Sequence, residues 1–93
     1  SSDKPEDYVQ DNTRLLDPTL TQVEGWIATV DTPDGSSIFI NEGCSTAAPE
    51  VREIQHGTTV TLMEKGDIWC LITYEGDEGY CLTSQLKLIA PEQ

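Results

Sequence analysis

Three cysteines and one histidine are the side chains of this chain best suited to nucleophilic or metal chemistry. They are Cys44, Cys70, Cys81 and His56. Together they would make a formal ligand set for Zn²⁺, but the sequence has no C-x-x-C pair to preorganise the metal. We therefore expect no metal site and no cofactor, and a zinc-stabilised domain is kept only as the last of three alternatives.

Catalysis would require a nucleophile or a base held by an orienting partner. His56 lies in a Gln-His-Gly sequence typical of a turn, where we expect a solvated imidazole rather than a general base. Cys44 lies in a loop of small residues close to Glu42, whose negative charge disfavours the thiolate. The glycines stand singly at turns and form no phosphate-binding loop. We predict that the chain has no catalytic residue and is not an enzyme.

Cys70 and Cys81 flank a predicted hairpin and could form a disulfide across it if the register allows. The alternative is a pair of small buried hydrophobic side chains. Because three cysteines are an odd number, a disulfide would leave one thiol over, and the redox compartment stays open.

The length and charge of the chain limit its fold and its partners. Its 93 residues suffice for one small domain, and no stretch approaches the roughly 18 consecutive apolar residues of a membrane span. The net charge of -12, from 17 acidic and 5 basic residues, opposes contact with a phosphate backbone. We expect no nucleic-acid partner and no membrane insertion, and we expect the chain to be a processed form or a part of a larger protein.

Composition divides the chain into three parts. Residues 1–22 are rich in acidic residues and form an N-terminal arm or linker, whose end near Leu16 and Leu20 could cover an open edge of the next part. Residues 23–90 form a β-rich domain, and residues 91–93 form its exit.

Short β-rich runs separated by turn residues fill the domain. Residues 58–63 alternate between polar and apolar side chains, as a half-buried strand does. Gly76 supplies the positive φ that a tight hairpin requires within the turn 75–78. The last run can return to the first and close the sheet. We predict an all-β protein, a small, partly open barrel of five to six antiparallel strands, from the runs 26–30, 38–40, 58–63, 68–74, 79–83 and 86–89.

Taken in order, these elements resemble the bacterial Src homology 3-like (SH3-type) family, whose members are SH3-like barrels of about this size. The segments that carry the similarity are Trp69-Cys70-Leu71-Ile72, Gly76, Gly79-Tyr80-Cys81-Leu82, the pair Ser84 and Leu86, and Gly57-Thr58. They are similar to the family's Trp-bearing strand, its turn glycine, its Gly-aromatic-aliphatic strand, its closing Ser and Leu, and its Gly-Thr strand start. The resemblance covers about Trp26 to Ile89.

One segment departs from the family pattern. In residues 38–45 the family shows Asn, then Val-Arg, then Gly-Pro, and only Gly43 is kept here. The eukaryotic relatives, which dock polyproline II helices, are our second choice because their tyrosine-rich opening motif is absent.

The resemblance implies a groove on the barrel surface in which the first Trp of its strand takes part. We expect Tyr80, Tyr74 and Phe39 to join Trp69 there, and the alternative for Tyr80 and Phe39 is the core. Acidic turns would give this groove rims suited to a cationic or amine-bearing peptide, or would be merely solvated. The turn residues of these rims are Asp31, Asp34 and Glu78.

These expectations favour a non-enzymatic recognition or targeting module. Its implied ligand is a peptide, a cell-wall peptide or a protein partner, and its expected location is an extracytoplasmic or cell-envelope protein of bacteria. The alternative is a structural accessory domain with no ligand of its own, packed on an enzyme or assembly partner through the same aromatic side chains.

Overall fold

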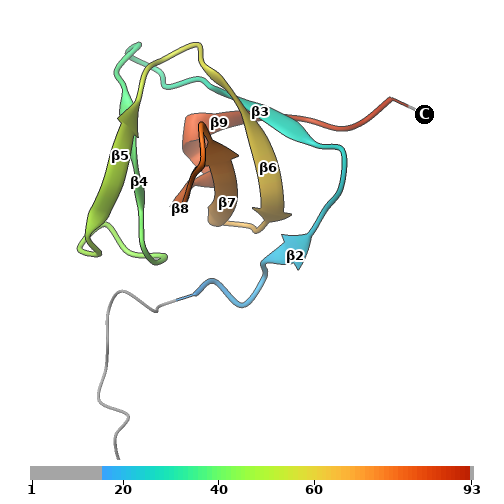
Figure 1. Ribbon diagram of the computed structural model, residues 1–93, viewed down its shortest axis with the longest axis horizontal. Coiled ribbons are helices and arrows are strands. Elements are labelled where there is room, and N and C mark those ends of the chain that lie inside the picture. The colour runs from blue at the N-terminus through green and yellow to red at the C-terminus, as the bar shows by residue number, and fades with distance from the viewer. Residues whose placement is uncertain (1–15, 93) are drawn as a thin grey trace, which may run out of the picture.

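The computed structural model describes residues 16–92 and consists of one antiparallel sheet with a single short 3₁₀ turn. Most of the predicted arm, residues 1–15, and Gln93 lie outside the described part. No α-helix occurs between Leu16 and Glu92. The all-β prediction is confirmed. The elements are β2 (Thr21–Gln22), β3 (Ile27–Val30), β4 (Ile38–Asn41), β5 (Glu50–Ile54), β6 (Thr59–Lys65), β7 (Trp69–Tyr74), β8 (Asp77–Leu82), η2 (Thr83–Gln85) and β9 (Leu86–Ile89) (Figure 1).

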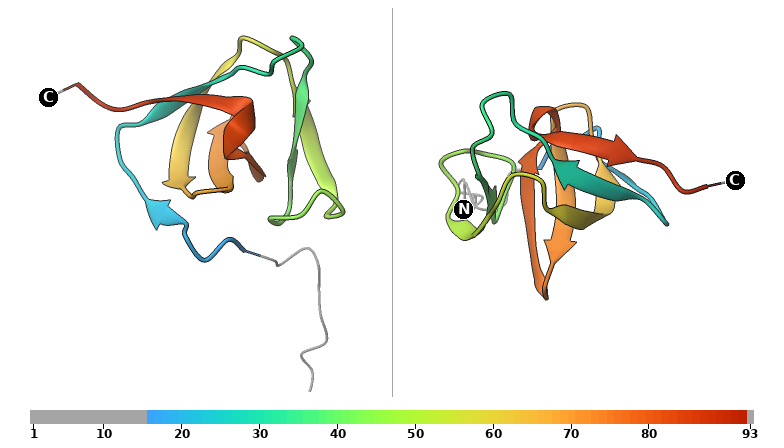
Figure 2. Two further views of the ribbon diagram at one scale, coloured as in Figure 1. Left: turned by 180° about the vertical axis from the view of Figure 1, so that it is seen from behind. Right: turned by 90° about the horizontal axis from the view of Figure 1, so that it is seen from above.

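The sheet curls on itself and remains open at one seam. Its strand order is β5-β4-β8-β7-β6-β3-β9, and β2 adds to β6 beside β3. Within residues 16–92 no ladder joins the two end strands, β5 and β9. Figure 2 shows the curl from behind and from above. The sheet has eight strands rather than the predicted five to six, because β2 and β5 were not expected.

Alternating side chains explain the core. On β6, Val60 and Leu62 are buried while Thr59 and Thr61 face solvent. The register then shifts between Leu62 and Glu64, so Met63 forms a bulge and is 38% exposed. The inward side chains of the other strands complete one hydrophobic core, which includes Ala28, Val30, Ile38, Ile40, Ile54, Cys70, Ile72, Cys81 and Leu86.

The β7–β8 hairpin has a shorter turn than the predicted residues 75–78. Glu75 and Gly76 both have positive φ, 52° and 87°, which is typical of a two-residue type I′ turn. Asp77 already pairs with Tyr74. The turn prediction was therefore right in place and two residues too long.

Cys70 and Cys81 are partners in the β7–β8 register, which the sequence had left open, and both are fully buried. They are free thiols in the structure, so the possible disulfide is not formed. The Cys70 Sγ lies 3.2 Å from the Thr83 Oγ1. Burial raises the pKa of the Cys81 thiol to about 12. The second sequence-based interpretation, two small apolar side chains, describes their packing.

The last strand returns to the first predicted strand, as expected, but it does not close the sheet, because β9 is an end strand with no ladder to β5 within residues 16–92. β9 runs antiparallel to β3, with Val30 opposite Leu86 and Ile27 opposite Ile89. At the other end of the chain, Thr21 pairs with Lys65, so the sheet begins before the predicted domain boundary at residue 23.

Candidate functional site

Two pockets lie beside the outer face of the β7–β8 hairpin. The alternate residues of these strands, such as Cys70 and Cys81, point into the core, so the remaining residues form an outer row. The cross-strand pairs of this row are Trp69 with Leu82, Leu71 with Tyr80, and Thr73 with Glu78. Leu82 lines one pocket and Glu78 lines the other, so Tyr80 stands between them on β8.

The first pocket, called here the aromatic pocket, opens where β4 separates from β8. These two strands pair only at Asn41 and Tyr80, and β4 then diverges. The volume of the opening is about 200 Å³. It is lined by Ser37, Ile38, Phe39, Asn41, Thr46, Glu50, Trp69, Leu82 and Gln85.

Gly79 allows the close approach of β4 and β8 at this junction. A Cβ at Gly79 would lie 2.9 Å from the Ile40 Cβ and 3.0 Å from the Asn41 carbonyl oxygen. Only a glycine at position 79 therefore allows β4 and β8 to come into contact beside the Asn41–Tyr80 pair, where the two strands begin to separate. Phe39 is 42% exposed and the Trp69 ring is half-buried, so both offer aromatic surface to the pocket.

The Trp69 backbone is fixed by the segment before β2. The Asp17 Oδ2 accepts hydrogen bonds from the N–H groups of Ile68 and Trp69, at 3.1 Å each. Its Oδ1 accepts two more from Thr19, and the Thr19 hydroxyl accepts one from Asp67 N–H. Hydrogen bonds from Thr19, and then from Trp69 and Ile68, lower the pKa of Asp17 from 3.8 to about 2.

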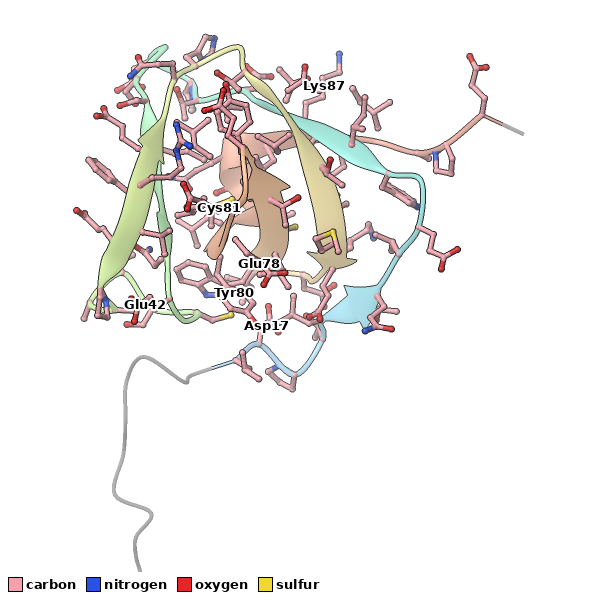
Figure 3. All side chains as sticks on the ribbon, in the orientation of Figure 1. Asp17, Glu42, Glu78, Tyr80, Cys81 and Lys87 are labelled. Carbon is pink, nitrogen blue, oxygen red and sulfur yellow. The ribbon has the colours of Figure 1, made fainter. Side chains whose placement is uncertain are left out.

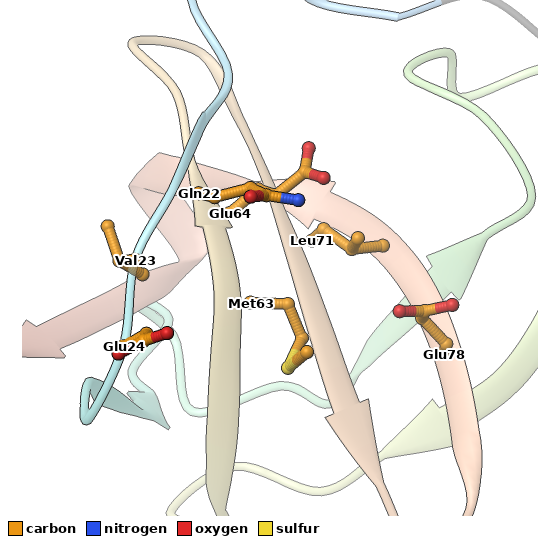
Figure 4. Close-up of a pocket in the computed structure, with 7 residues that line it drawn as sticks. All are labelled: Gln22, Val23, Glu24, Met63, Glu64, Leu71 and Glu78. Atoms are coloured by element: carbon orange, nitrogen blue, oxygen red, sulfur yellow. The ribbon is translucent and has the colours of Figure 1, made fainter.

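The second pocket, called here the acidic pocket, lies over the outer face of β6, β7 and β8. Its volume is about 530 Å³, and it is lined by Gln22, Val23, Glu24, Met63, Glu64, Leu71 and Glu78 (Figure 4). Sequence reasoning missed this pocket, except for Glu78, because one wall comes from residues 22–24, which were assigned to the arm or its boundary. No local motif links these residues.

Tyr80 lies half-buried between the two pockets. Burial raises the pKa of its phenol, and the negative charges of Glu64 and Glu78 add to this effect. The phenol is therefore neutral at physiological pH and can donate or accept a hydrogen bond. Figure 3 shows Tyr80 and Glu78, which both lie on β8.

Of the predicted groove residues, two line the aromatic pocket, one lines the acidic pocket, and four line neither: respectively Phe39 and Trp69, Glu78, and Tyr80, Tyr74, Asp31 and Asp34. Tyr74 is half-buried against the core, and the Arg52 guanidinium stands 4.9 Å from the centre of its ring. Asp31 and Asp34 belong to the β3–β4 loop and line neither pocket. Asp34 instead accepts hydrogen bonds from the Ser36 hydroxyl and N–H, which lower its pKa.

The two candidate reactive groups, His56 and Cys44, lie in different surroundings. The His56 Nδ1 lies 3.4 Å from the Thr32 backbone nitrogen, and its ring belongs to an exposed turn. Burial raises the pKa of Cys44, and the neighbouring charges of Asp17 and Glu64 raise it further. Over residues 16–92 no three His, Cys, Asp or Glu side chains gather as a metal site. In the same part of the chain no helix is long and apolar enough to cross a membrane.

Comparisons with protein families, with curated proteins and with solved structures find no match for this chain.

Proposed function

We propose that this protein is a non-enzymatic recognition module of the bacterial SH3 type that binds an extended peptide in its aromatic pocket. The observation that carries the proposal is the meeting of Phe39 and Trp69 in one concave opening, although they are thirty positions apart in the sequence. Exposed aromatic side chains in a pocket are typical anchors of binding sites, since they offer large contact areas at low entropic cost.

Polar groups around the two rings suit a peptide main chain. The Gln85 Oε1 accepts a hydrogen bond from Leu82 N–H at 3.2 Å, which holds the side-chain amide at the pocket. Asn41 is 7% exposed at the point where β4 leaves β8. Beyond that point β4 has no partner on this side within residues 16–92, so its backbone can pair with an added chain.

The proposal is tested by measuring the binding of soluble cell-wall stem peptides and of synthetic extended peptides with isothermal titration calorimetry at low salt. Trp69→Ala should raise Kd by about tenfold or more, because it removes the larger anchor. Ile68→Ala is the matched control, since Ile68 is 61% exposed, adjacent and outside the pocket. Equal affinity of the two folded variants would contradict the proposal.

A second candidate function is that of a structural accessory domain. Ile27 and Ile89 are cross-strand partners on the open-edge strand pair β3–β9 and are 39% and 38% exposed. Such a pair favours packing on a protein partner. Absence of saturable peptide binding at low salt would favour this function over peptide recognition.

We propose a cell-envelope location on the basis of the family resemblance alone. Fractionation of the source cells with an antibody against the domain would test it, and recovery of the protein in the cytoplasmic fraction would contradict it.

A further inference from the structure

We propose that the acidic pocket binds a cationic alkyl chain, the side chain of a lysine in a basic peptide. This inference concerns a different pocket from the aromatic one and does not depend on the proposed function.

The pocket combines an apolar floor with a charged rim. Met63 and Leu71 lie in the middle of the pocket, and Val23 lies on one wall (Figure 4). Leu71 is only 9% exposed, so its side chain offers a packed surface rather than a mobile one. An alkyl stem of four methylene groups can cover such a floor while its ammonium group stays at the rim.

The rim carries three carboxylates from three separate segments. Glu24 follows β2, Glu64 lies on β6 and Glu78 lies on β8, so folding brings them around one opening. An ammonium group has three donors, so it can bond to whichever of these carboxylates it approaches at the rim. The net charge of -12 adds long-range attraction for a cation.

Two of the three basic residues of the described part are engaged elsewhere, and the third, Lys87, is exposed on β9 and does not line the pocket. Arg52 pairs with Glu75 and Asp77, and Lys65 holds its ammonium 5.9 Å from the centre of the Trp26 ring. Between residues 16 and 92 no ion pair satisfies the three rim glutamates. As far as residues 16–92 are concerned, an external cation would therefore meet three carboxylates that have no ion-pair partner, over an apolar surface.

The proposal is tested by titrating the full chain with N-acetyl-lysine methylamide and measuring the amide chemical shifts of the protein by NMR. Saturable shifts should appear at Met63, Leu71 and Glu78, and the norleucine analogue, which has a similar alkyl chain and no charge, should produce none. The double variant Glu64→Gln/Glu78→Gln should raise Kd roughly fivefold or more, because two charge pairs are lost.

The matched control is Asp31→Asn/Glu92→Gln, which removes the same charge away from the pocket. An equal loss of affinity in this control would mean that only the overall field attracts the probe, and it would overturn the proposal. Equal binding of the norleucine analogue would also overturn it.

The chain has two further basic residues, Lys4 and Arg14, outside the described part. If Lys4→Gln/Arg14→Gln strengthens probe binding by about tenfold, the chain itself occupies the pocket and the proposal of an external ligand is wrong. Unchanged affinity supports it. Trp69→Ala should leave lysine binding intact, so failure here and failure of the aromatic pocket can be told apart.

Discussion

The Asp17 carboxylate holds the start of β7 by accepting a hydrogen bond from the Trp69 backbone N–H, with the Oδ2 3.1 Å from that nitrogen. Fifty-two positions separate the two residues in the sequence. The same oxygen accepts a hydrogen bond from the Ile68 N–H. Together the two hydrogen bonds attach the segment before β2 to the strand that carries the Trp69 indole of the aromatic pocket. The backbone at this pocket is therefore positioned by a residue that lines neither pocket.

This attachment should depend on pH. Docking lowers the pKa of Asp17 from 3.8 to about 2, so the ionised carboxylate favours the docked segment. The stabilisation of the docked segment by the ionised Asp17 carboxylate is complete above about pH 4 and is lost as the pH falls toward 2. We expect the amide shifts of Ile68 and Trp69 to titrate in that range. Asp17→Asn should abolish the titration, and Asp67→Asn, which changes a neighbouring carboxylate, should preserve it.

Gly79→Ala should destabilise the protein at the β4–β8 junction. The new Cβ would meet the Ile40 Cβ and the Asn41 carbonyl oxygen at 3.0 Å or less, and backbone atoms cannot move aside easily. We expect a loss of about 1–3 kcal/mol in the free energy of unfolding, measured with urea. Gly76→Asn is the control, because a Cβ there meets nothing within 4 Å and Asn tolerates positive φ. An Ala variant as stable as the parent would show that β4 is free to shift.

Arg52 should stabilise the packing of β5 against the β7–β8 hairpin. Its Nη1 lies 3.3 Å from Glu75 and 3.2 Å from Asp77, and the guanidinium covers the Tyr74 ring. Because both carboxylates are largely exposed, we expect Arg52→Gln to cost only about 1 kcal/mol of the free energy of unfolding. High salt should reduce the difference. Lys87→Gln, an exposed change on β9, should cost much less, and equal costs would contradict the assigned role.

Thiol reactivity should separate the three cysteines. Burial raises the pKa of Cys81 to about 12, and Cys70 is equally inaccessible, so neither should react with a thiol reagent in the folded protein. Cys44 is half-buried with a raised pKa and should react slowly, faster at higher pH. We expect one reactive thiol in native buffer and three in denaturant. Cys44→Ser should leave none in native buffer, and rapid labelling of that variant would contradict the burial of the pair.

If both proposed pockets bind, one peptide should engage both. Leu82 and Glu78 are four residues apart on one face of β8, a span of about 13 Å. An extended peptide with an aromatic residue at i and a lysine at i+4 places both side chains on one side at that spacing. We expect it to bind roughly tenfold more tightly than the i, i+3 peptide in a competition assay. Equal affinities would show that the two pockets cannot be occupied by one extended chain.

Local patterns accounted for much of the sheet. The alternation before Met63 predicted β6, and Gly76 predicted the position of the hairpin turn. The two unpredicted strands, β2 and β5, lack the alternation of buried and exposed side chains by which a strand is predicted from sequence. β5 buries only Ile54 fully, and its charged residues Glu50, Arg52 and Glu53 are exposed or half-buried, while β2 spans two residues and exists only through pairing with β6.

The sequence predicted residues of the candidate site only where the residue type and the expected strand were enough to place them. Phe39 and Trp69 were expected together, and the structure brings them together. Tyr74 fits an aromatic groove by residue type, but Arg52 covers it, and no sequence pattern indicates that β5 places a guanidinium there. The acidic pocket depends on contacts between distant segments, including the bulge at Met63, so composition predicted its charge without its location.

The sparse pairing of β4 with β8 has a consequence for how this scaffold could diversify. Three of the residues that the aromatic pocket draws from the β4–β5 side, Phe39, Thr46 and Glu50, are exposed, and changes there leave the ladders among the other strands untouched. Libraries randomised at these three positions should keep the parental melting temperature while changing ligand preference. The protein would then behave as an invariant framework carrying a variable patch on β4, β5 and the loop between them.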